Sequence, residues 1–219
     1  YYGKEKEVVT GTVQRVMGKN VSINLGKADA VLSENEQVKG ETFQPTERIK
    51  VYILEVKDTP KGPRMLVSRT HPGLVKRLFE SEVAEVKDGT VEIKSIAREA
   101  GSRTKIAVWS NDPDVDAVGA CVGMNGARVN AVVEELRGEK IDIINWDENP
   151  AILIENALSP AKVIAVMADP DEKTALVVVP DYQLSLAIGK EGQNARLAAR
   201  LTGFKIDIKS ETQAKEAGD

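Results

Sequence analysis

The first seventy residues alternate between apolar and polar positions in short runs. Alternation over four to eight residues is typical of β-strands with one buried face. Turn-forming residues separate these runs, as at Gly18-Lys19-Asn20 and Lys61-Gly62-Pro63. The pattern therefore predicts five short strands, near residues 8–13, 21–25, 30–32, 49–56 and 64–69. Five short strands within about sixty residues favour a small closed barrel.

From Pro72 onward the apolar period becomes that of helices. A helix is expected at 74–83, before two strands, two helices and a third strand. The same order then recurs to the end of the chain. The first set of elements is predicted at 74–83, 90–98, 103–109, a short helix up to 122, 127–137 and 140–144. The second set is predicted at 150–158, 163–168, 174–179, 183–188, 193–201 and 205–208.

A glycine loop separates the paired helices of each repeat. The first loop is Gly123-Met124-Asn125-Gly126, and the second is Gly189-Lys190-Glu191-Gly192. Glycine permits positive φ and the close approach of another backbone, and the following helix begins with unpaired N–H groups. A phosphodiester suits such a site, so each loop is a candidate nucleic-acid clamp.

The loops and their flanking elements resemble the KH domain, in its prokaryotic-type (type II) order of helix, strand, strand, helix, helix, strand. The residues before them, with V-x-G-x-V, a glycine turn, V-x-I-x-L and a closing L-x-S-R, resemble the OB-fold RNA-binding barrel of the largest small-subunit ribosomal protein. The expected fold class is α+β multidomain, with a five-stranded OB-fold β-barrel before two tandem KH domains. The expected boundaries are 1–71, 72–145, 146–210 and a disordered tail at 211–219.

Four longer strings, 118–123, 133–142, 156–161 and 183–203, look like the RNA-binding region of the NusA family of bacterial transcription factors. The resemblance implies a cytoplasmic elongation factor that modulates RNA polymerase pausing, termination and antitermination while it holds single-stranded nascent RNA. It also implies contact with other factors of the elongation complex. Contact with RNA polymerase would come mainly through an N-terminal domain that precedes the barrel in family members and that this chain lacks.

The candidate RNA-binding residues lie mainly at the two loops and at the starts of the helices that follow them. Asn130 or Asn194 is expected to hydrogen-bond base edges. Arg69 is included because it matches the closing basic position of the barrel family, with Arg15 and Lys19 near the expected binding face. The full set is Gly123, Met124, Asn125, Gly126, Arg128, Gly189, Lys190, Glu191, Gly192, Gln193, Asn194, Arg196, Arg200 and Arg69.

The net charge of −4 is unevenly distributed along the chain. Residues 1–69 carry 12 basic and 9 acidic side chains, and residues 181–209 carry 5 and 3, whereas residues 146–180 carry 2 and 6. This distribution predicts modest non-specific affinity for nucleic acid. Aromatic residues make up only 4% of the chain, so base stacking is not expected to dominate.

Three classes of function remain open: an RNA-binding transcription factor, an enzyme and a protein-binding scaffold. One histidine, one cysteine and scattered carboxylates offer no catalytic constellation, so we expect no enzyme, no cofactor and no metal. His71 and Cys121 are interpreted as structural. No apolar run is long enough for a membrane span, and no membrane partner is expected. The scaffold hypothesis stays open for the barrel.

Overall fold

The computed structural model describes residues 2–218, which form two compact units. The first unit contains the N-terminal segment up to residue 84, the short turn 100–102 and residues 127–139. The second unit contains residues 85–99, 103–126 and the remainder from residue 140. Each unit has its own hydrophobic core.

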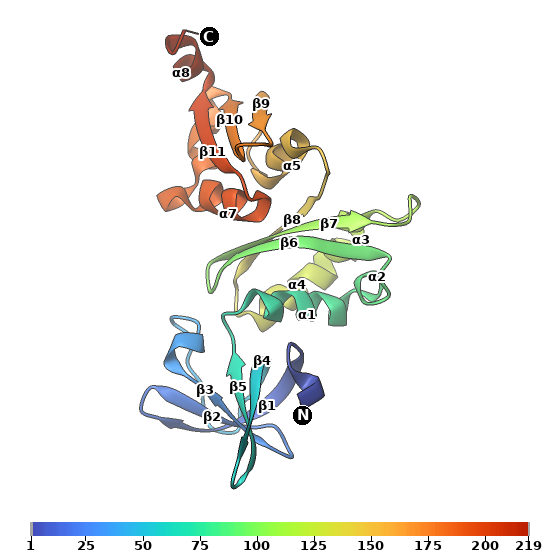
Figure 1. Cartoon of the computed structure of the whole chain (residues 1–219), viewed down its shortest axis with the longest axis vertical. Coiled ribbons are helices and arrows are strands. Elements are labelled where there is room, and N and C mark those ends of the chain that lie inside the picture. The colour runs from blue at the N-terminus through green and yellow to red at the C-terminus, as the bar shows by residue number, and fades with distance from the viewer. Residues whose placement is uncertain (1, 219) are drawn as a thin grey trace. The chain divides into compact units, whose positions relative to one another are not determined.

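Five strands form a closed barrel in the first unit (Figure 1). Their order is β1-β2-β3-β5-β4, in which β3 and β5 run parallel and the other neighbours run antiparallel. The predicted five-stranded barrel is confirmed. The elements are η1 (Tyr2–Lys4), β1 (Val8–Met17), β2 (Asn20–Asn24), β3 (Asp29–Leu32), η2 (Glu34–Glu36), β4 (Arg48–Thr59) and β5 (Gly62–Ser68).

Alternate residues of these strands fill the barrel, as the period of two predicts. Ile23, Leu32 and Met65 are completely buried there. Irregularities in the register bend the two longest strands, at Val13/Arg15 in β1 and Ile53/Glu55 in β4. Gly11 is required by close packing, because a Cβ atom there would lie 2.4 Å from Cγ2 of Ile23.

Two helices complete the first unit and pack on each other, α1 (Pro72–Glu82) and α4 (Ala127–Glu135). His71 caps α1, because its Nδ1 accepts a hydrogen bond of 2.9 Å from the amide of Gly73. Its ring stacks on Tyr52 with the ring centroids 4.4 Å apart. The structural interpretation of His71 is therefore confirmed.

Arg69 joins the barrel to α4 from a fully buried position, with 1% of its surface exposed. Its guanidinium donates to both carboxylate oxygens of Glu41 at 2.9 Å each. It also donates to the carbonyls of Lys50, at 2.8 Å, and Glu135, at 3.1 Å. The sequence-based prediction that Arg69 contacts RNA is wrong, because the barrel and α4 enclose the side chain and use its donors.

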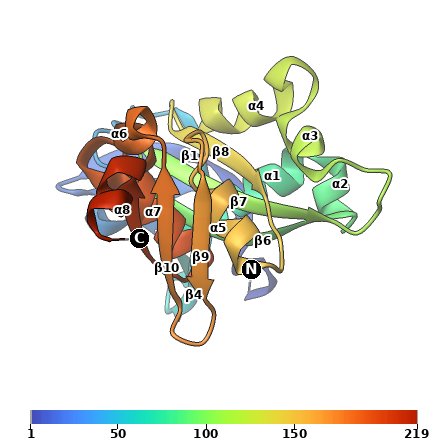
Figure 2. The same ribbon diagram turned by 90° about the horizontal axis from the view of Figure 1, so that it is seen from above.

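Two three-stranded sheets of the same topology lie in the second unit. In each sheet the middle strand pairs antiparallel with the strand before it and parallel with the last one, and Figure 2 shows the antiparallel pair β9 and β10 side by side. The repeated strands share one register, since Arg103 is opposite Lys140 and Thr174 is opposite Lys205. The strands are β6 (Val91–Glu99), β7 (Arg103–Ser110), β8 (Lys140–Asn145), β9 (Ala165–Asp169), β10 (Thr174–Val179) and β11 (Lys205–Ser210).

One hydrophobic core runs through the second unit. It combines Ala97, Ala107 and Ile144, from the first sheet, with the buried residues of the second repeat, including Leu197 and Leu201 of α7. The sheet of the first repeat is thus covered on one face by the helix that follows the second glycine loop. The remaining helices are α2 (Ala84–Lys87), α3 (Ala117–Val122), η3 (Met124–Gly126), α5 (Pro150–Ala157), η4 (Asp181–Gln183), α6 (Leu184–Ile188), η5 (Lys190–Gly192), α7 (Gln193–Thr202) and α8 (Glu211–Glu216).

A buried ionic cluster lies within this second unit. Lys105 is fully buried, and its Nζ donates to Asp142, at 2.9 Å, and to the carbonyl of Ser159, at 2.7 Å. Arg103 also donates to Asp142, with its Nε 2.8 Å from Oδ2 and its second nitrogen 3.0 Å from Oδ1. The cluster joins β7 and β8 to the segment after α5, so it fixes the position of the second repeat on the first sheet.

The tail predicted to be disordered instead contains helix α8. Ser210 accepts a hydrogen bond from the amide of Gln213, and the Gln213 side chain accepts one from the amide of Ser210. This capping box supplies partners for amides that a short helix would otherwise leave unpaired. Among the residues that the structure describes, no helix is long and apolar enough to cross a membrane.

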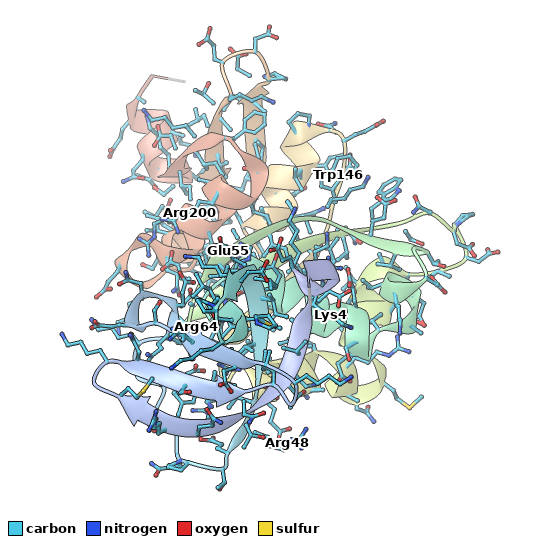
Figure 3. All side chains as sticks on the ribbon, turned by 60° about the horizontal axis from the view of Figure 1, so that its bottom comes forward. Lys4, Arg48, Glu55, Arg64, Trp146 and Arg200 are labelled. Carbon is cyan, nitrogen blue, oxygen red and sulfur yellow. The ribbon has the colours of Figure 1, made fainter. Side chains whose placement is uncertain are left out.

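Substitution of Arg69 tests the buried link between the barrel and α4. Arg69→Met leaves Glu41, whose side chain is only 6% exposed, without its cation. We expect a loss of about 3–5 kcal/mol of unfolding free energy, measured by urea denaturation. Arg64→Met is the control, since Arg64 is an exposed residue of β5, the strand that ends just before Arg69 (Figure 3). Similar small losses in both variants would contradict the assigned role.

A second prediction concerns acid stability. Burial by itself raises the pKa of Asp142 more than any other single influence, but the hydrogen bonds from Arg103 and Lys105 and the positive charges of both side chains together outweigh it, so the pKa is lower than that of an ordinary aspartate. A lowered carboxyl pKa stabilises the fold above about pH 4, and this stability is lost as the pH falls through the folded-state value.

Asp142→Asn removes that contribution. We expect the variant to be less stable than wild type at pH 7 and to lose less stability than wild type between about pH 5 and pH 3. Asp207→Asn is the matched control, because Asp207 occupies the same position of the second repeat and is exposed. Thermal melts over this pH range would contradict the assignment if the two asparagine variants behaved alike.

Candidate nucleic-acid interface

The two glycine loops have the same backbone conformation, residue by residue. Gly123 has φ 77° and ψ 170°, and Gly189 has φ 80° and ψ 168°. The third residues are both left-handed, with φ 55° and ψ 26° at Asn125 and φ 57° and ψ 24° at Glu191. Both closing glycines have φ 77°, and each donates a 3.1 Å hydrogen bond to the carbonyl of the opening glycine. The sequence repeat is therefore a repeat of shape.

Close packing explains the first glycine of the second loop. A Cβ atom on Gly189 would lie 2.7 Å from the amide nitrogen of Asn194 and 2.9 Å from its Cβ. The loop therefore passes directly over the first turn of α7. Gly192, at the N-cap of α7, has no side chain to occupy the amides of that turn. These amides and the positive end of the helix dipole suit an anion.

Charged side chains around the second loop are partly neutralised. Lys190 is exposed at the loop itself. Arg196 and Arg200 lie one turn apart on α7, where the sequence predicts a basic track, but Glu99 of β6 pairs with both, at 2.7 Å and 3.8 Å. The hydrogen bond from Arg196 lowers the pKa of Glu99, and the same bond raises the pKa of Arg196. The carboxylate of Glu99 is thus firmly ionised.

The first loop presents different chemistry on the same backbone. Met124 is 85% exposed at its tip, and Asn125 is exposed beside it. Arg128 is half-buried on α4, and Asn130, two residues further on, is exposed. An apolar side chain and an amide occupy the positions of Lys190 and Glu191. The first loop therefore offers backbone donors and an apolar contact with no charge at the tip.

A groove of about 860 Å³ lies beside α3 and β8 of the first repeat. Apolar side chains of Val118, Ile143 and Val163 contribute to its lining, as do the amides of Asn145 and Asn156, which can donate and accept hydrogen bonds. Such a groove suits a base read along its edges. The sequence predicts an apolar groove between the loop and the adjacent strand. The groove found here lies elsewhere, because α3, β8, α5 and the segment after α5 line it and residues 123–126 do not. The other lining residues are Asp116, Ile144, Glu155, Ser159, Ala161 and Lys162.

A further hollow, of about 530 Å³, lies on the barrel over β2, β3 and the turn from β4 to β5. Arg15, Lys61 and Arg64 line it, and Met17 adds a partly exposed apolar surface. Arg15 thus lines this hollow, and its part in an RNA-binding face stays a prediction. The turn at Lys61 supplies a further cation that pattern analysis does not assign to the site.

Asn194 is a second correction to the predicted site. It is 5% exposed, and its side-chain amide donates to the carbonyls of Leu158, at 3.0 Å, and Ala187, at 2.9 Å. The side chain therefore holds the start of α7 against α5 and α6 and does not reach a base edge. Apart from Arg69 and Arg200, the other predicted residues lie in the two loops or in the first turns of the helices that follow them, and Arg200 lies one turn after Arg196 on α7.

Sequence reasoning also missed Glu99, which shapes the second loop from another repeat. The one available signal is its place at the end of a strand with a buried face. Within the described part of the chain, no group of three or more histidine, cysteine, aspartate or glutamate side chains is arranged to hold a metal ion.

Three family models match the chain in succession. They are the S1 RNA binding domain at residues 3–68, the NusA-like first KH domain at 69–146 and the NusA-like second KH domain at 150–216. Together they account for nearly all of the sequence.

Curated proteins with similar sequences carry one description, transcription termination/antitermination protein NusA. The protein of Bacillus subtilis is 60% identical over 218 residues, which cover 100% of this chain and 59% of that protein. The protein of Halalkalibacterium halodurans is 57% identical, covering 100% of this chain and 57% of that protein. The protein of Thermus thermophilus is 50% identical over 207 residues, with coverages of 94% and 54%. The chain therefore spans somewhat more than half the length of these relatives.

Alanine substitutions test the packing at the second loop. Gly189→Ala adds a methyl group 2.7 Å from the backbone of α7 at a positive φ, whereas Gly203→Ala has a similar φ of 76° and meets nothing within 4 Å. Gly203, with ψ 12°, is in the left-handed region that alanine enters at a cost of about 1–2 kcal/mol, whereas Gly189, with ψ 168°, is in a region that essentially only glycine adopts. We expect Gly189→Ala to lose at least about 1 kcal/mol more unfolding free energy than Gly203→Ala in urea denaturation. Equal losses of unfolding free energy in the two variants would show that the loop accommodates the added methyl group at no extra cost.

Proposed function

Because the chain belongs to the NusA family of transcription termination/antitermination proteins, we propose that it holds single-stranded RNA with its two glycine loops during transcription. In this proposal the RNA is the nascent transcript, and its capture modulates pausing, termination and antitermination by RNA polymerase. The likeness of the two loops, whose matched φ and ψ angles differ by no more than 3°, is the observation that supports it most directly. The two loops share this conformation although their middle residues differ, so we infer that a common function, and not the local sequence, accounts for it.

Each loop would hold the sugar-phosphate backbone through amides, while bases lie in the neighbouring groove. Glycines let the RNA backbone approach closely, and the helix that follows provides partial positive charge. At the second loop Lys190 adds a full charge. At the first loop Met124 can pack against a ribose or base, and Arg128 and Asn130 follow on α4. The first repeat would therefore rely more on shape and the second more on charge.

The linked repeats would bind a longer RNA segment than either loop alone. The shared core in the second unit supports this proposal, because it joins the first sheet to the whole second repeat. Binding at one loop raises the effective concentration of RNA at the other. The basic hollow of the barrel, with Arg15, Lys61 and Arg64, is a further surface that we propose for RNA. This surface favours RNA over the protein-scaffold hypothesis for the barrel.

The proposal also covers partners and location. We propose that the protein acts in the cytoplasm with RNA polymerase and other elongation factors, and that it acts by binding and not by catalysis. Contact with RNA polymerase would use mainly the part of the family protein ahead of the barrel. The RNA-binding residues we propose are the two loops with Arg128, Gln193, Arg196 and Arg200.

A loop variant tests the clamp. Met124 and Asn125, and Lys190 and Glu191, are all changed to aspartate, which tolerates the left-handed third position. The added carboxylates repel phosphates and remove charge-assisted contacts, so affinity for a short unstructured RNA should fall at least about tenfold at ~0.1 M salt. Fluorescence anisotropy over a salt series measures the change.

The control for this variant carries the same change in net charge at exposed lysines outside the loops, Lys87→Asp and Lys173→Asp. We expect it to lose much less affinity, since screening weakens charge at a distance. Circular dichroism establishes that both variants are folded. Unchanged affinity in the folded loop variant would assign RNA to the barrel or remove RNA from the function.

A further inference from the structure

Glu99 places one carboxylate against three side chains of α7. Its Oε2 accepts from Nε of Arg196 at 2.7 Å, and its Oε1 accepts from a terminal nitrogen of the same guanidinium at 2.8 Å. Gln193 donates to Oε1 at 3.4 Å, and Arg200 approaches Oε2 at 3.8 Å. Glu99 belongs to β6, at the end of a strand of the first repeat, whereas all three partners follow the second glycine loop. Figure 3 labels Arg200 on this helix.

The pairing has the geometry that proteins use for phosphate. Arginine binds carboxylates and phosphates with the same fork of two parallel hydrogen bonds. The remaining terminal nitrogen of Arg196 donates to the carbonyl of Glu191 at 3.0 Å, so the guanidinium is fixed against the loop itself. An RNA phosphate held by the loop would therefore lie near the arginine that Glu99 already occupies.

The first repeat carries an uncharged residue at the position of Arg196. Asn130 stands four residues after Gly126, in the position that Arg196 holds after Gly192. An arginine at this position, with Glu99 as its acidic partner, thus distinguishes the second loop from the equivalent position of the first. A device needed only to hold the helix in place would not require a cation that faces the loop and is 41% exposed.

We propose that Glu99 stands in for an RNA phosphate on Arg196, so that RNA must displace it to bind fully at the second loop. This inference rests on the proposed function. It adds Glu99 as the residue that sets how tightly an RNA must bind in order to occupy the second loop. The carboxylate cancels one of the two charges of Arg196 and Arg200, which lowers attraction for any polyanion. RNA that also fits the loop and the groove makes additional contacts, which offset the free-energy cost of displacing Glu99. RNA held by charge alone makes no such contacts. Glu99 therefore favours selective over indiscriminate binding.

Removal of the negative charge of Glu99 is expected to tighten RNA binding. Glu99→Gln keeps the size of the side chain and releases the charge of Arg196. Each extra phosphate contact on a single strand steepens the slope of log affinity against log salt by about 0.7, which corresponds to about fivefold tighter binding at ~0.1 M salt. We expect this gain for short single-stranded RNAs of unrelated sequence, measured by fluorescence anisotropy from about 0.05 to 0.3 M salt.

Glu92→Gln is the matched control. Glu92 lies on the same strand, is exposed and pairs with Lys94 at 2.9 Å, so this variant makes the same change in net charge. It should leave the salt slope within error of wild type. Arg196→Gln should weaken binding, and in that background Glu99→Gln should recover only the smaller gain that passes through Arg200. Thermal melts report on the fold of every variant.

The outcomes separate this inference from the proposed function. Wild-type binding with an unchanged or shallower slope in folded Glu99→Gln overturns the inference and leaves the proposed function in place. Equal gains in both glutamine variants also overturn it, because general charge then explains them. If wild type does not bind RNA, the proposed function fails, and titration with inorganic polyphosphate decides the inference. Tighter polyphosphate binding by Glu99→Gln supports the phosphate site, and equal binding overturns it.

Discussion

The packing of α7 against the sheet of the first repeat is the constraint on which the functional part of the second unit depends. This contact buries Ala97 and Ala107 beneath Leu197 and Leu201, and it makes one core from two repeats. Apolar burial of this kind contributes roughly 25 cal/mol per Å² and has no preferred direction. Directional groups must therefore fix the alignment. Lys105, which is fully buried and donates to Asp142 and to the carbonyl of Ser159, does so at the loop after α5.

Buried charges serve alignment in both units. Arg69 and Lys105 are almost completely enclosed, and each binds at least one carboxylate and at least one backbone carbonyl. Enclosure costs each ion its hydration, and the Coulomb attraction offsets this cost only when the geometry is good and the other donors find partners. The net stabilisation is small, whereas any alternative arrangement that separates the ions is heavily disfavoured. These pairs therefore specify which surfaces meet more than they strengthen the contact.

The two loops show how one backbone can be tuned in two ways. Their conformations match within a few degrees, so the N–H groups that they present to an anion are the same. Met124 and Lys190 then differ in charge and polarity at equivalent positions. Because screening by salt weakens charge contacts more than backbone hydrogen bonds in a close fit, the repeats should respond differently to ionic strength. The ion pair of Glu99 with Arg196 further adjusts the second loop, because it reduces the positive charge that the loop region offers to RNA.

The sequence by itself determined the barrel, the order of elements in both repeats and the positions of the glycine loops. Apolar periods, turn residues and glycines act over a few residues, so they can be read along the chain. It also determined His71 as structural, since the residue precedes Pro72 at the start of a helix. The helix at Glu211–Glu216 was missed because a short polar segment has no apolar period, although Ser210 and Gln213 carry the capping signal. Only the tertiary structure decided that Arg69 and Asn194 are buried and that Glu99 reaches α7. Those outcomes depend on which distant element covers a side chain, and a residue's own neighbours in sequence do not contain that information.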